Sequence, residues 1–218
     1  MFVPKIYRVD GDEWPRRIIR EHALATLTTN GEPFPYATHL PALLAPDTPP
    51  DAPLAGSEVW GHMNRANPHW RALADGSPAL LVFQGPGAYV TPAVYGVDPA
   101  APTWDFVSVH VRGRLRPVRD REETLRIILA TVRHLEGSLG DAWDPTSSLD
   151  YFRQILPGVG AFRLEVEEVD AMFKLSQEKD AEVRERVVDR FENGHGDHPR
   201  LAQLIRCHGD GPSGKEEA

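Results

Sequence analysis

The chain has 218 residues, 41% of them hydrophobic and 26% charged, which is the balance of an ordinary globular protein. Its formal net charge is −8 and its basic residues are scattered among acidic ones, which argues against nucleic acid as a partner. No apolar run reaches membrane-spanning length, the first residues lack signal-peptide order and there is one cysteine, so we expect a cytoplasmic protein without membrane contact.

The first half of the chain predicts helices and strands in turn. The segment 12–22, "DEWPRRIIREH", opens with acidic residues and has a proline in its first turn, which is typical of a helix start. Two apolar, β-branched runs around Asn30 and Gly31 predict a β-hairpin. After a proline-rich loop, the strand "EVWGHM" at 58–63 precedes a helix, for which Asn67 is a suitable N-cap.

The second half predicts longer strands. Alternation and composition indicate strands at 79–96, 104–118 and 158–173, and helical periodicity indicates helices at 120–140, 147–156 and 180–191. We expect Gly85, Pro86 and Gly87 to break the first of these strands. In the second strand, alternation places Val107, Val109 and Val111 on one face, and Ser108, His110 and Arg112 on the other. The apolar stripe predicted for the first of these helices is Leu125, Ile128, Leu129 and Val132.

Strands joined by hairpins, with helices at their edges, predict a mainly β fold with peripheral helices, an α+β arrangement around a β-barrel. We expect this domain to span 1–192. The remaining segment, 193–218, is rich in Gly, Asp and His and is expected to be a flexible tail.

Four of the nine histidines fall on predicted strands or at strand ends, where a barrel could bring them to one cavity: His39, His62, His69 and His110. For His62 two interpretations stay open. It is either a buried imidazole that a backbone carbonyl satisfies, or an axial ligand to iron or a polar contact to a flat cofactor. If His62 is not the metal ligand, His69 and His39 are the alternatives.

Two short runs predict places where an anion could bind. Within "GHMNRANPHW" at 61–70, Arg65 and the helix that starts after Asn67 could hold a haem propionate or a flavin phosphate. Within "AMFKLSQE" at 171–178, three polar residues follow a strand, although a solvated strand end would look the same.

Other candidates also have two interpretations. His110 and Arg112 share one strand face, which is either solvated or part of a pocket. Tyr89 and Trp104 are either core or dimer-interface residues, or the walls of a pocket. Trp70 stands next to His69, whose ring could simply cap or pack.

Six motifs then occur in an order that resembles the PaiB-like proteins, the FMN-binding split-barrel group. They are "MFVPKIYR", "ATHLP", "GHMNRANPHWRAL", "VFQGPGAYVTP", "APTWDFVSVHVRG" and "MFKLSQE". The resemblance runs from Met1 to about Arg190. It implies a split β-barrel that forms a homodimer, with cofactor sites at the subunit interface.

Within this group the chain is most similar to the piperazate synthases, which are haem proteins. This resemblance rests on "GHMNRANPHW", "TPAVYGVDPAAPTW" and "YFRQILPGVGAF". The sequence departs from the usual pattern at Gly87, where His or Asn is common, and at Asp105, where Asn is common. The resemblance implies haem b, with FMN as the alternative, and conversion of N5-hydroxy-L-ornithine to L-piperazic acid with loss of water.

The residue roles that follow from this resemblance are hypotheses. His62 is the expected axial ligand, and the expected catalytic residues are His62, His110 and Lys174. Arg65 and Lys174 would bind propionates or the substrate carboxylate, and His110 or His39 would move protons. The residues expected to hold the cofactor are His62, Arg65, Asn67, Trp70, Tyr89, Trp104, Arg112, Lys174, Ser176 and Gln177.

Three other functions remain as alternatives. The same barrel could serve an FMN-dependent oxidoreductase or a haem-degrading protein. PaiB-like proteins are also described as negative transcriptional regulators, but the acidic balance and the lack of a helix-turn-helix pattern argue against DNA binding here.

Overall fold

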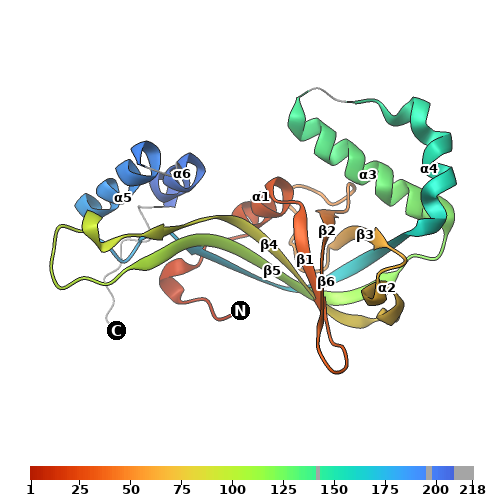
Figure 1. The fold of residues 1–218 in the computed structure, drawn as a ribbon, viewed down its shortest axis with the longest axis horizontal. Helices are drawn as coiled ribbons and strands as arrows, with labels where there is room; N and C mark the ends of the chain where they lie inside the picture. The colour runs from red at the N-terminus through yellow and green to blue at the C-terminus, as the bar shows by residue number, and fades with distance from the viewer. Residues whose placement is uncertain (141–142, 195–197, 209–218) are drawn as a thin grey trace. The chain divides into compact units, whose positions relative to one another are not determined.

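A computed structural model describes residues 1–140, 143–194 and 198–208 of the chain (Figure 1). Within these residues, six strands close into a barrel in the order β1-β2-β3-β6-β5-β4. The predicted mainly β barrel with peripheral helices is confirmed. The strands are β1 (Leu24–Thr29), β2 (Tyr36–Leu44), β3 (Glu58–Asn64), β4 (Ser77–Val90), β5 (Thr103–Pro117) and β6 (Val159–Lys174).

The helices lie between and after these strands. The α-helices are α1 (Glu13–Glu21), α2 (Pro68–Ala72), α3 (Arg121–Leu139), α4 (Leu149–Ile155), α5 (Ala181–Asn193) and α6 (Pro199–His208). Short 3₁₀ turns are η1 (Lys5–Tyr7), η2 (Pro92–Val94), η3 (Pro145–Ser148) and η4 (Leu156–Gly158). In the described ranges, no helix combines the length and the apolar character that crossing a membrane requires.

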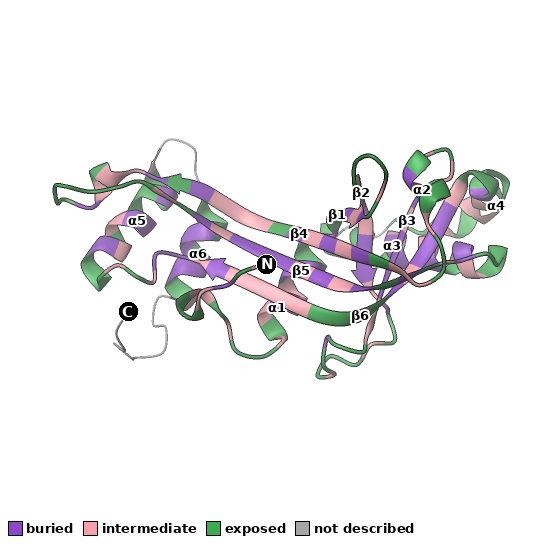
Figure 2. Cartoon of the chain, turned by 90° about the horizontal axis from the view of Figure 1, so that it is seen from below, coloured by how far each residue is buried: buried purple, intermediate pink, exposed green. Residues whose placement is uncertain are grey.

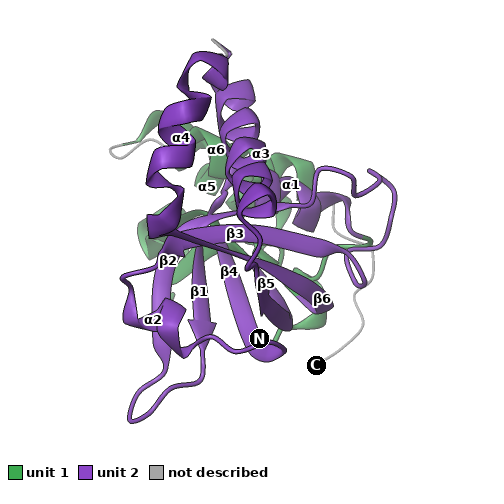
Figure 3. Ribbon diagram, turned by 90° about the vertical axis from the view of Figure 1, so that its right-hand side faces the viewer, with its two compact units in different colours: residues 1–11, 84–108, 170–218 green, residues 12–83, 109–169 purple. Residues whose placement is uncertain are grey.

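The chain divides into two compact units, coloured separately in Figure 3. Unit 1 comprises residues 1–11, 84–108 and 170–218, and unit 2 comprises residues 12–83 and 109–169. One boundary precedes α1, and the other three fall within β4, β5 and β6. Unit 2 contains β1, β2 and β3 with helices α1 to α4, and unit 1 contains α5 and α6.

The predicted hairpin forms, but its loop is longer than two residues. The β1–β2 pairing ends at Thr29 opposite Tyr36, so the loop covers residues 30–35. Pro33 and Pro35 in this loop have no N–H to donate to the partner strand, which explains why the pairing stops before the Asn-Gly pair is reached.

The predicted break at Gly85, Pro86 and Gly87 is wrong, because β4 runs through all three residues. A Cβ atom on Gly85 would lie 3.1 Å from the Cβ of Val107, and one on Gly87 would lie 2.9 Å from the Cβ of Phe106. Both neighbours are on β5. The two glycines therefore allow β4 to approach β5 closely, and they do not end the strand.

The buried positions of β5 alternate along much of its length (Figure 2). Val107, Val109 and Val111 are fully buried, as the alternation predicts. Ser108 on the opposite face is also buried, so that face is not simply solvated.

Helix α3 packs on β2 and β3 through a face turned slightly from the predicted one. Its buried residues are Thr124, Leu125, Ile127, Ala130 and Thr131, whereas three of the four predicted stripe residues are half-buried. Small side chains at 130 and 131 permit close approach to the strands. The core cluster in this region is Leu43, Ala45, Trp60, Val118, Ile127, Ala130 and Ala161.

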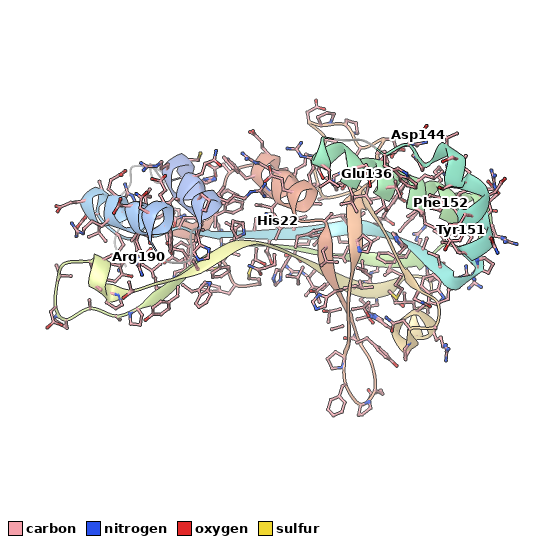
Figure 4. All side chains as sticks on the ribbon, turned by 45° about the horizontal axis from the view of Figure 1, so that its top comes forward. His22, Glu136, Asp144, Tyr151, Phe152 and Arg190 are labelled. Atoms are coloured by element: carbon pink, nitrogen blue, oxygen red, sulfur yellow. The ribbon has the colours of Figure 1, made fainter. Side chains whose placement is uncertain are left out.

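Polar and aromatic contacts join the segment after α3 to the start of α4. The backbone N–H of Trp143 donates to Oε2 of Glu136 at 3.2 Å, and the Trp143 ring meets Phe152 edge-on with centroids 6.2 Å apart. Figure 4 labels Glu136 on α3 and Phe152 on α4. These contacts hold α4 near the end of α3.

The expectation of a flexible tail from residue 193 does not hold for residues 199–208, which form α6. Leu201, Ala202, Leu204 and Ile205 are buried, and α6 packs against α5. These four residues recur at helical spacing, so the apolar periodicity was present within the polar tail. The remaining tail residues, 195–197 and 209–218, lie outside the described residues.

The closest approach that a glycine permits within unit 2 is between β5 and β6. A Cβ on Gly113 would lie 1.9 Å from the carbonyl oxygen of Glu165, which is backbone and cannot rotate away. We predict that Gly113→Ala lowers the free energy of unfolding by about 2 kcal/mol or more, measured by urea titration.

Gly137→Ala is the matched control, because a Cβ added to this exposed helical glycine would meet no neighbouring atom within 4 Å. The control should raise the free energy of unfolding by about 0.5–1 kcal/mol, since alanine restricts the unfolded chain and favours helix. Equal effects of the two substitutions would contradict the close β5–β6 approach.

Candidate functional site

A cavity of about 390 Å³ opens in unit 2 where the pairing of β2 with β3 ends. The last paired residues are Ala42 and Gly61, so continued pairing would place Pro41 opposite His62. Pro41 has no N–H to donate, and the two strands part at this point. The cavity is lined from β2, from β3 and the turn after it, and from the start of β6 by Thr38, His39, Leu40, Pro41, His62, Met63, Asn64, Asn67, Gly158 and Val159.

His62 is half-buried on β3, where it pairs with Ala161 of β6. Its Nδ1 is buried and has no hydrogen-bond partner among the described residues. Burial lowers the pKa of the imidazole, so the ring is neutral at neutral pH. A neutral imidazole at a cavity wall fits the role of a ligand to iron.

His39 lines the same cavity from β2 and is exposed. Its Nδ1 lies 2.9 Å from the hydroxyl oxygen of Thr26 on the neighbouring strand β1. This contact orients the ring and leaves Nε2 as the nitrogen for a ligand. The structure therefore brings His39 and His62, both predicted candidates, to one cavity.

His69, the other alternative metal ligand, is buried and its ring is fully engaged. Its Nε2 lies 2.9 Å from the hydroxyl oxygen of Thr29, and its Nδ1 lies 2.9 Å from that of Thr38. The ring also stacks on Tyr36, with centroids 5.1 Å apart and an angle of 16° between the planes. Because both nitrogens have partners, His69 has none to give to a metal in this structure.

The predicted anion clamp after His62 is already engaged by protein groups. Arg65 donates from Nε to the carbonyl oxygen of Val159 at 2.8 Å, and its guanidinium lies 5.7 Å from the centre of the Trp70 ring. The Asn67 side chain caps α2 by accepting from the backbone N–H of His69 at 2.9 Å, as the sequence predicts. Helix α2 has only five residues, so its dipole is small.

The predicted β5 candidates lie away from this cavity. Neither His110 nor Arg112 is among the described residues that line it. Arg112 forms an ion pair with Glu168 of β6 at 2.9 Å. The next arginines along the strand do the same, Arg114 with Glu167 and Arg116 with Glu165.

In unit 1, the predicted Lys-Leu-Ser-Gln run forms a turn around a buried carboxylate. Asp105 is fully buried and accepts at Oδ2 from the Ser176 hydroxyl at 2.6 Å and at Oδ1 from the Ser176 N–H at 3.2 Å. Ser176 has a φ of 57°, the only positive φ of a non-glycine residue in the described ranges. Asp105 thus holds Ser176 in a strained conformation and occupies the place where an outside anion would meet it.

The neighbours of Ser176 are used in the same turn. The Gln177 side chain accepts from the Leu175 N–H at 2.7 Å and donates to the Phe173 carbonyl. Lys174 contacts the Thr103 hydroxyl, and its ammonium lies 5.9 Å from the centre of the Tyr7 ring. These contacts do not support the predicted anion site at 174–177.

Two exposed aromatic residues of unit 1 form a pair, and a tyrosine of the same unit is buried. Tyr89 and Trp104 meet edge-on with centroids 6.2 Å apart, and each is about half exposed. Tyr95 is buried, and its hydroxyl has no hydrogen-bond partner among the described residues.

Sequence reasoning missed two features that shape the cavity. Thr38 was not a candidate, although it directly precedes His39 in the "ATHLP" motif. Pro41 in the same motif was a signal that β2 could not pair with β3 throughout. Among the described residues, no group of three or more His, Cys, Asp or Glu side chains is arranged to hold a metal ion.

Comparison with known proteins gives a family and a fold. A family model described as "Putative FMN-binding domain" matches residues 1–168. The "Protease synthase and sporulation protein PAI 2" of Bacillus subtilis is 29% identical over 209 residues, which cover 94% of this chain and 96% of that protein.

Two solved structures have a similar fold. The FAD and Heme binding protein from Mycobacterium smegmatis matches with a TM-score of 0.57 and 16% identity, covering 81% of this chain and 77% of that one. The Flavocytochrome Anf3 from Azotobacter vinelandii matches with a TM-score of 0.51 and 17% identity, covering 77% and 69%.

The buried Asp105 generates a prediction about pH. Burial raises the pKa of Asp105 from its ordinary value of 3.8 to about 6, against the lowering effect of the Ser176 hydrogen bonds. Between pH 3.8 and about 6, the folded protein keeps the Asp105 proton that the unfolded chain loses. The contribution of Asp105 to the free energy of unfolding therefore rises as the pH falls. Asp105→Asn can still accept from the Ser176 N–H through its amide oxygen and can donate from its amide nitrogen to the Ser176 hydroxyl oxygen. It should therefore be more stable than the parent at pH 7.5 by on the order of 2 kcal/mol.

The advantage of the Asp105→Asn variant should shrink as the pH is lowered toward 4.5, where the parent aspartate is protonated in the folded state. Urea titrations of both proteins at the two pH values check this. An unchanged difference between them would show that Asp105 does not carry the shifted titration.

Proposed function

The chain belongs to the family described as "Putative FMN-binding domain", the PaiB-like split barrels, and we propose that it is a haem-dependent cyclase that converts N5-hydroxy-L-ornithine to L-piperazic acid. The observation that carries this proposal is His62, a neutral imidazole that lines the cavity. Its Nδ1 is enclosed, which leaves Nε2 as the nitrogen that can reach an iron atom.

The imidazoles of the cavity wall favour haem over FMN, because a haem iron takes a histidine ligand and a flavin takes none. The described residues that line the cavity include two imidazoles but neither Lys nor Arg. An FMN phosphate and the two haem propionates are both anionic, and proteins usually meet such charges with cations or a helix N-terminus, so the lack of Lys and Arg in the lining bears on both cofactors alike. Solved structures of this fold include a flavin- and haem-binding protein and a flavocytochrome, so the fold alone does not decide between the cofactors.

We also propose that a second copy of the chain completes the site. A cavity of about 390 Å³ is at the small end of the range for ligand pockets, about 300–1,000 Å³. A haem bound through His62 would extend beyond such a cavity. The homodimer that the split-barrel resemblance implies would supply the remaining wall.

The proposed reaction joins two nitrogens of one substrate. The lone pair of the α-amine forms the N–N bond to N5, the N–O bond breaks with its electrons going to oxygen, and a proton from the α-amine completes water as the leaving group. Bound haem would supply a Lewis-acidic iron that draws electron density from the hydroxylamine oxygen. The cavity walls would fold the flexible chain so that the two nitrogens meet.

His39 is the residue best placed to move the proton. It lines the cavity with His62, and the Thr26 contact at Nδ1 fixes its ring. Its Nε2 can accept the proton of the α-amine and return it to the leaving oxygen, as a general acid–base group does. His110 and Lys174, the other predicted catalytic residues, have no position in the cavity lining.

We predict that His62→Ala abolishes the Soret band of the purified protein reconstituted with haemin, because it removes the axial ligand. His39→Gln is the matched control, since it replaces the other imidazole of the same cavity and should keep the band. An unchanged spectrum in the His62 variant would exclude the assignment. A yellow protein that carries FMN and takes up no haemin would reject the haem proposal as a whole.

We predict separately that His39→Gln lowers kcat for L-piperazic acid formation about 100-fold, because glutamine cannot exchange a proton. Mass detection of product from N5-hydroxy-L-ornithine measures this. Unchanged kcat in the haem-loaded His39→Gln protein would assign proton transfer to another group, whereas no product from the parent would reject the proposed reaction.

A further inference from the structure

The cavity wall next to His62 contains a hydrogen-bonded chain that connects the cavity to a buried histidine. Thr38 lines the cavity, and its hydroxyl contacts both Asn67 and His69. His69 in turn reaches Thr29 on β1. Thr29 is buried and is not among the described residues that line the cavity. The series of hydrogen bonds therefore connects a buried residue of β1 to the cavity wall.

The direction of the first hydrogen bond is fixed. The Asn67 side-chain oxygen accepts from the backbone N–H of His69 at 2.9 Å, which can only be a donor. The other end of the amide is therefore Nδ2, which donates to the Thr38 oxygen at 3.1 Å. One lone pair of the Thr38 hydroxyl is thus taken, and its proton and second lone pair remain to be placed.

Two neutral forms of His69 place the Thr38 proton differently. If Nδ1 is unprotonated, Thr38 donates to it, and Nε2–H donates to Thr29; Thr38 then offers only a lone pair to the cavity. If Nδ1 carries the proton, Thr38 accepts a second hydrogen bond, and its own proton points elsewhere. The ring is buried and its pKa is lowered by that burial, so it carries one proton in either form.

We propose that His69 is a positioning residue in its Nε2–H form, and that it makes Thr38 a hydrogen-bond acceptor for an amine or hydroxylamine group of the ligand. In this form the hydrogen bonds run head to tail from Asn67 through Thr38 and His69 to Thr29, so each strengthens the next. The proposal rests on the proposed function in taking an N–H or O–H group of the substrate as the partner of Thr38.

This assignment gives the wall a definite specificity. A lone pair of Thr38 attracts an ammonium, an amine or an N-hydroxyl group and repels a carboxylate or phosphate. The lining has no Lys or Arg among its described residues to offset that repulsion. The inference therefore places the amine-bearing end of a substrate at Thr38 and any anionic group elsewhere.

The first test is the protonation of the His69 ring in the full-length protein prepared without cofactor. Long-range ¹H–¹⁵N correlation spectra distinguish the two neutral forms. We expect protonated Nε2 and unprotonated Nδ1 at pH 7. A ring protonated at Nδ1, or on both nitrogens, would overturn the proposal without use of any variant.

The second test is ligand preference, with 1,4-diaminobutane as a probe that only donates and acetate as a probe that only accepts. Thr38→Val should weaken diamine binding about tenfold, as loss of one hydrogen bond to a charged group does. Thr28→Val is the control, since this β1 threonine is not among the cavity residues. No diamine binding by the parent, or equal binding by the Thr38 variant, would overturn the proposal.

The third test acts from outside the cavity. Thr29→Val removes the acceptor for Nε2–H, and a buried N–H without a partner is less tolerated than an unused lone pair. The His69 proton should move to Nδ1, free the Thr38 proton, and shift preference from diamine toward acetate. A purely structural role of His69 would change stability but would move neither the tautomer nor the preference.

None of these measurements requires haem or turnover. A protein that takes up no haemin but shows the expected tautomer and diamine preference would reject the proposed function and leave this inference standing. Haem uptake with an Nδ1-protonated His69 would reject the inference alone. Circular dichroism of each variant checks that its fold is kept.

Discussion

The candidate site depends on the place where two neighbouring strands stop pairing. β2 remains paired with β1 as far as Pro41, while β3 remains paired with β6 through His62 and beyond. The pairing of β2 with β3 ends at Ala42 and Gly61, one residue before Pro41 and His62 would meet. Because side chains alternate along a strand, a shift of one residue in the β3–β6 register would turn His62 to the other face. One proline and one register therefore determine both the cavity and the imidazole in its wall.

The three histidines near this opening differ in the hydrogen-bond partners of their ring nitrogens. His69 has a hydroxyl partner for each ring nitrogen, His39 has one at Nδ1, and the buried Nδ1 of His62 has none among the described residues. The sequence made all three candidates for the same role, because type and spacing do not reveal hydrogen-bond partners. Only the fold separates the buried structural imidazole from the one available to a ligand.

Most of the architecture could be predicted from the sequence. Alternating valines identified β5, and Asn67 with Pro68 identified the start of α2, since these patterns follow from local backbone geometry. The continuation of β4 through Gly85 and Gly87 could not be predicted, because these glycines are needed for the close approach of the neighbouring strand β5. Likewise, the sequence made Ser176 a candidate anion ligand, because it does not reveal that the Ser176 hydroxyl donates a hydrogen bond to the carboxylate of Asp105, which is distant in sequence.

The paired charges on β5 and β6 bear on a role in gene regulation, which the PaiB-like resemblance raises. Arg112, Arg114 and Arg116 are the nearest approach to a basic stripe in this sequence, and each has a glutamate partner on β6. A nucleic-acid backbone that met this face would have to displace three carboxylates before it could release its own counterions, which removes the usual entropic gain of such contacts. The glutamates therefore reduce the positive potential that these three arginines present to a polyanion, and the ion pairs weaken as the salt concentration rises.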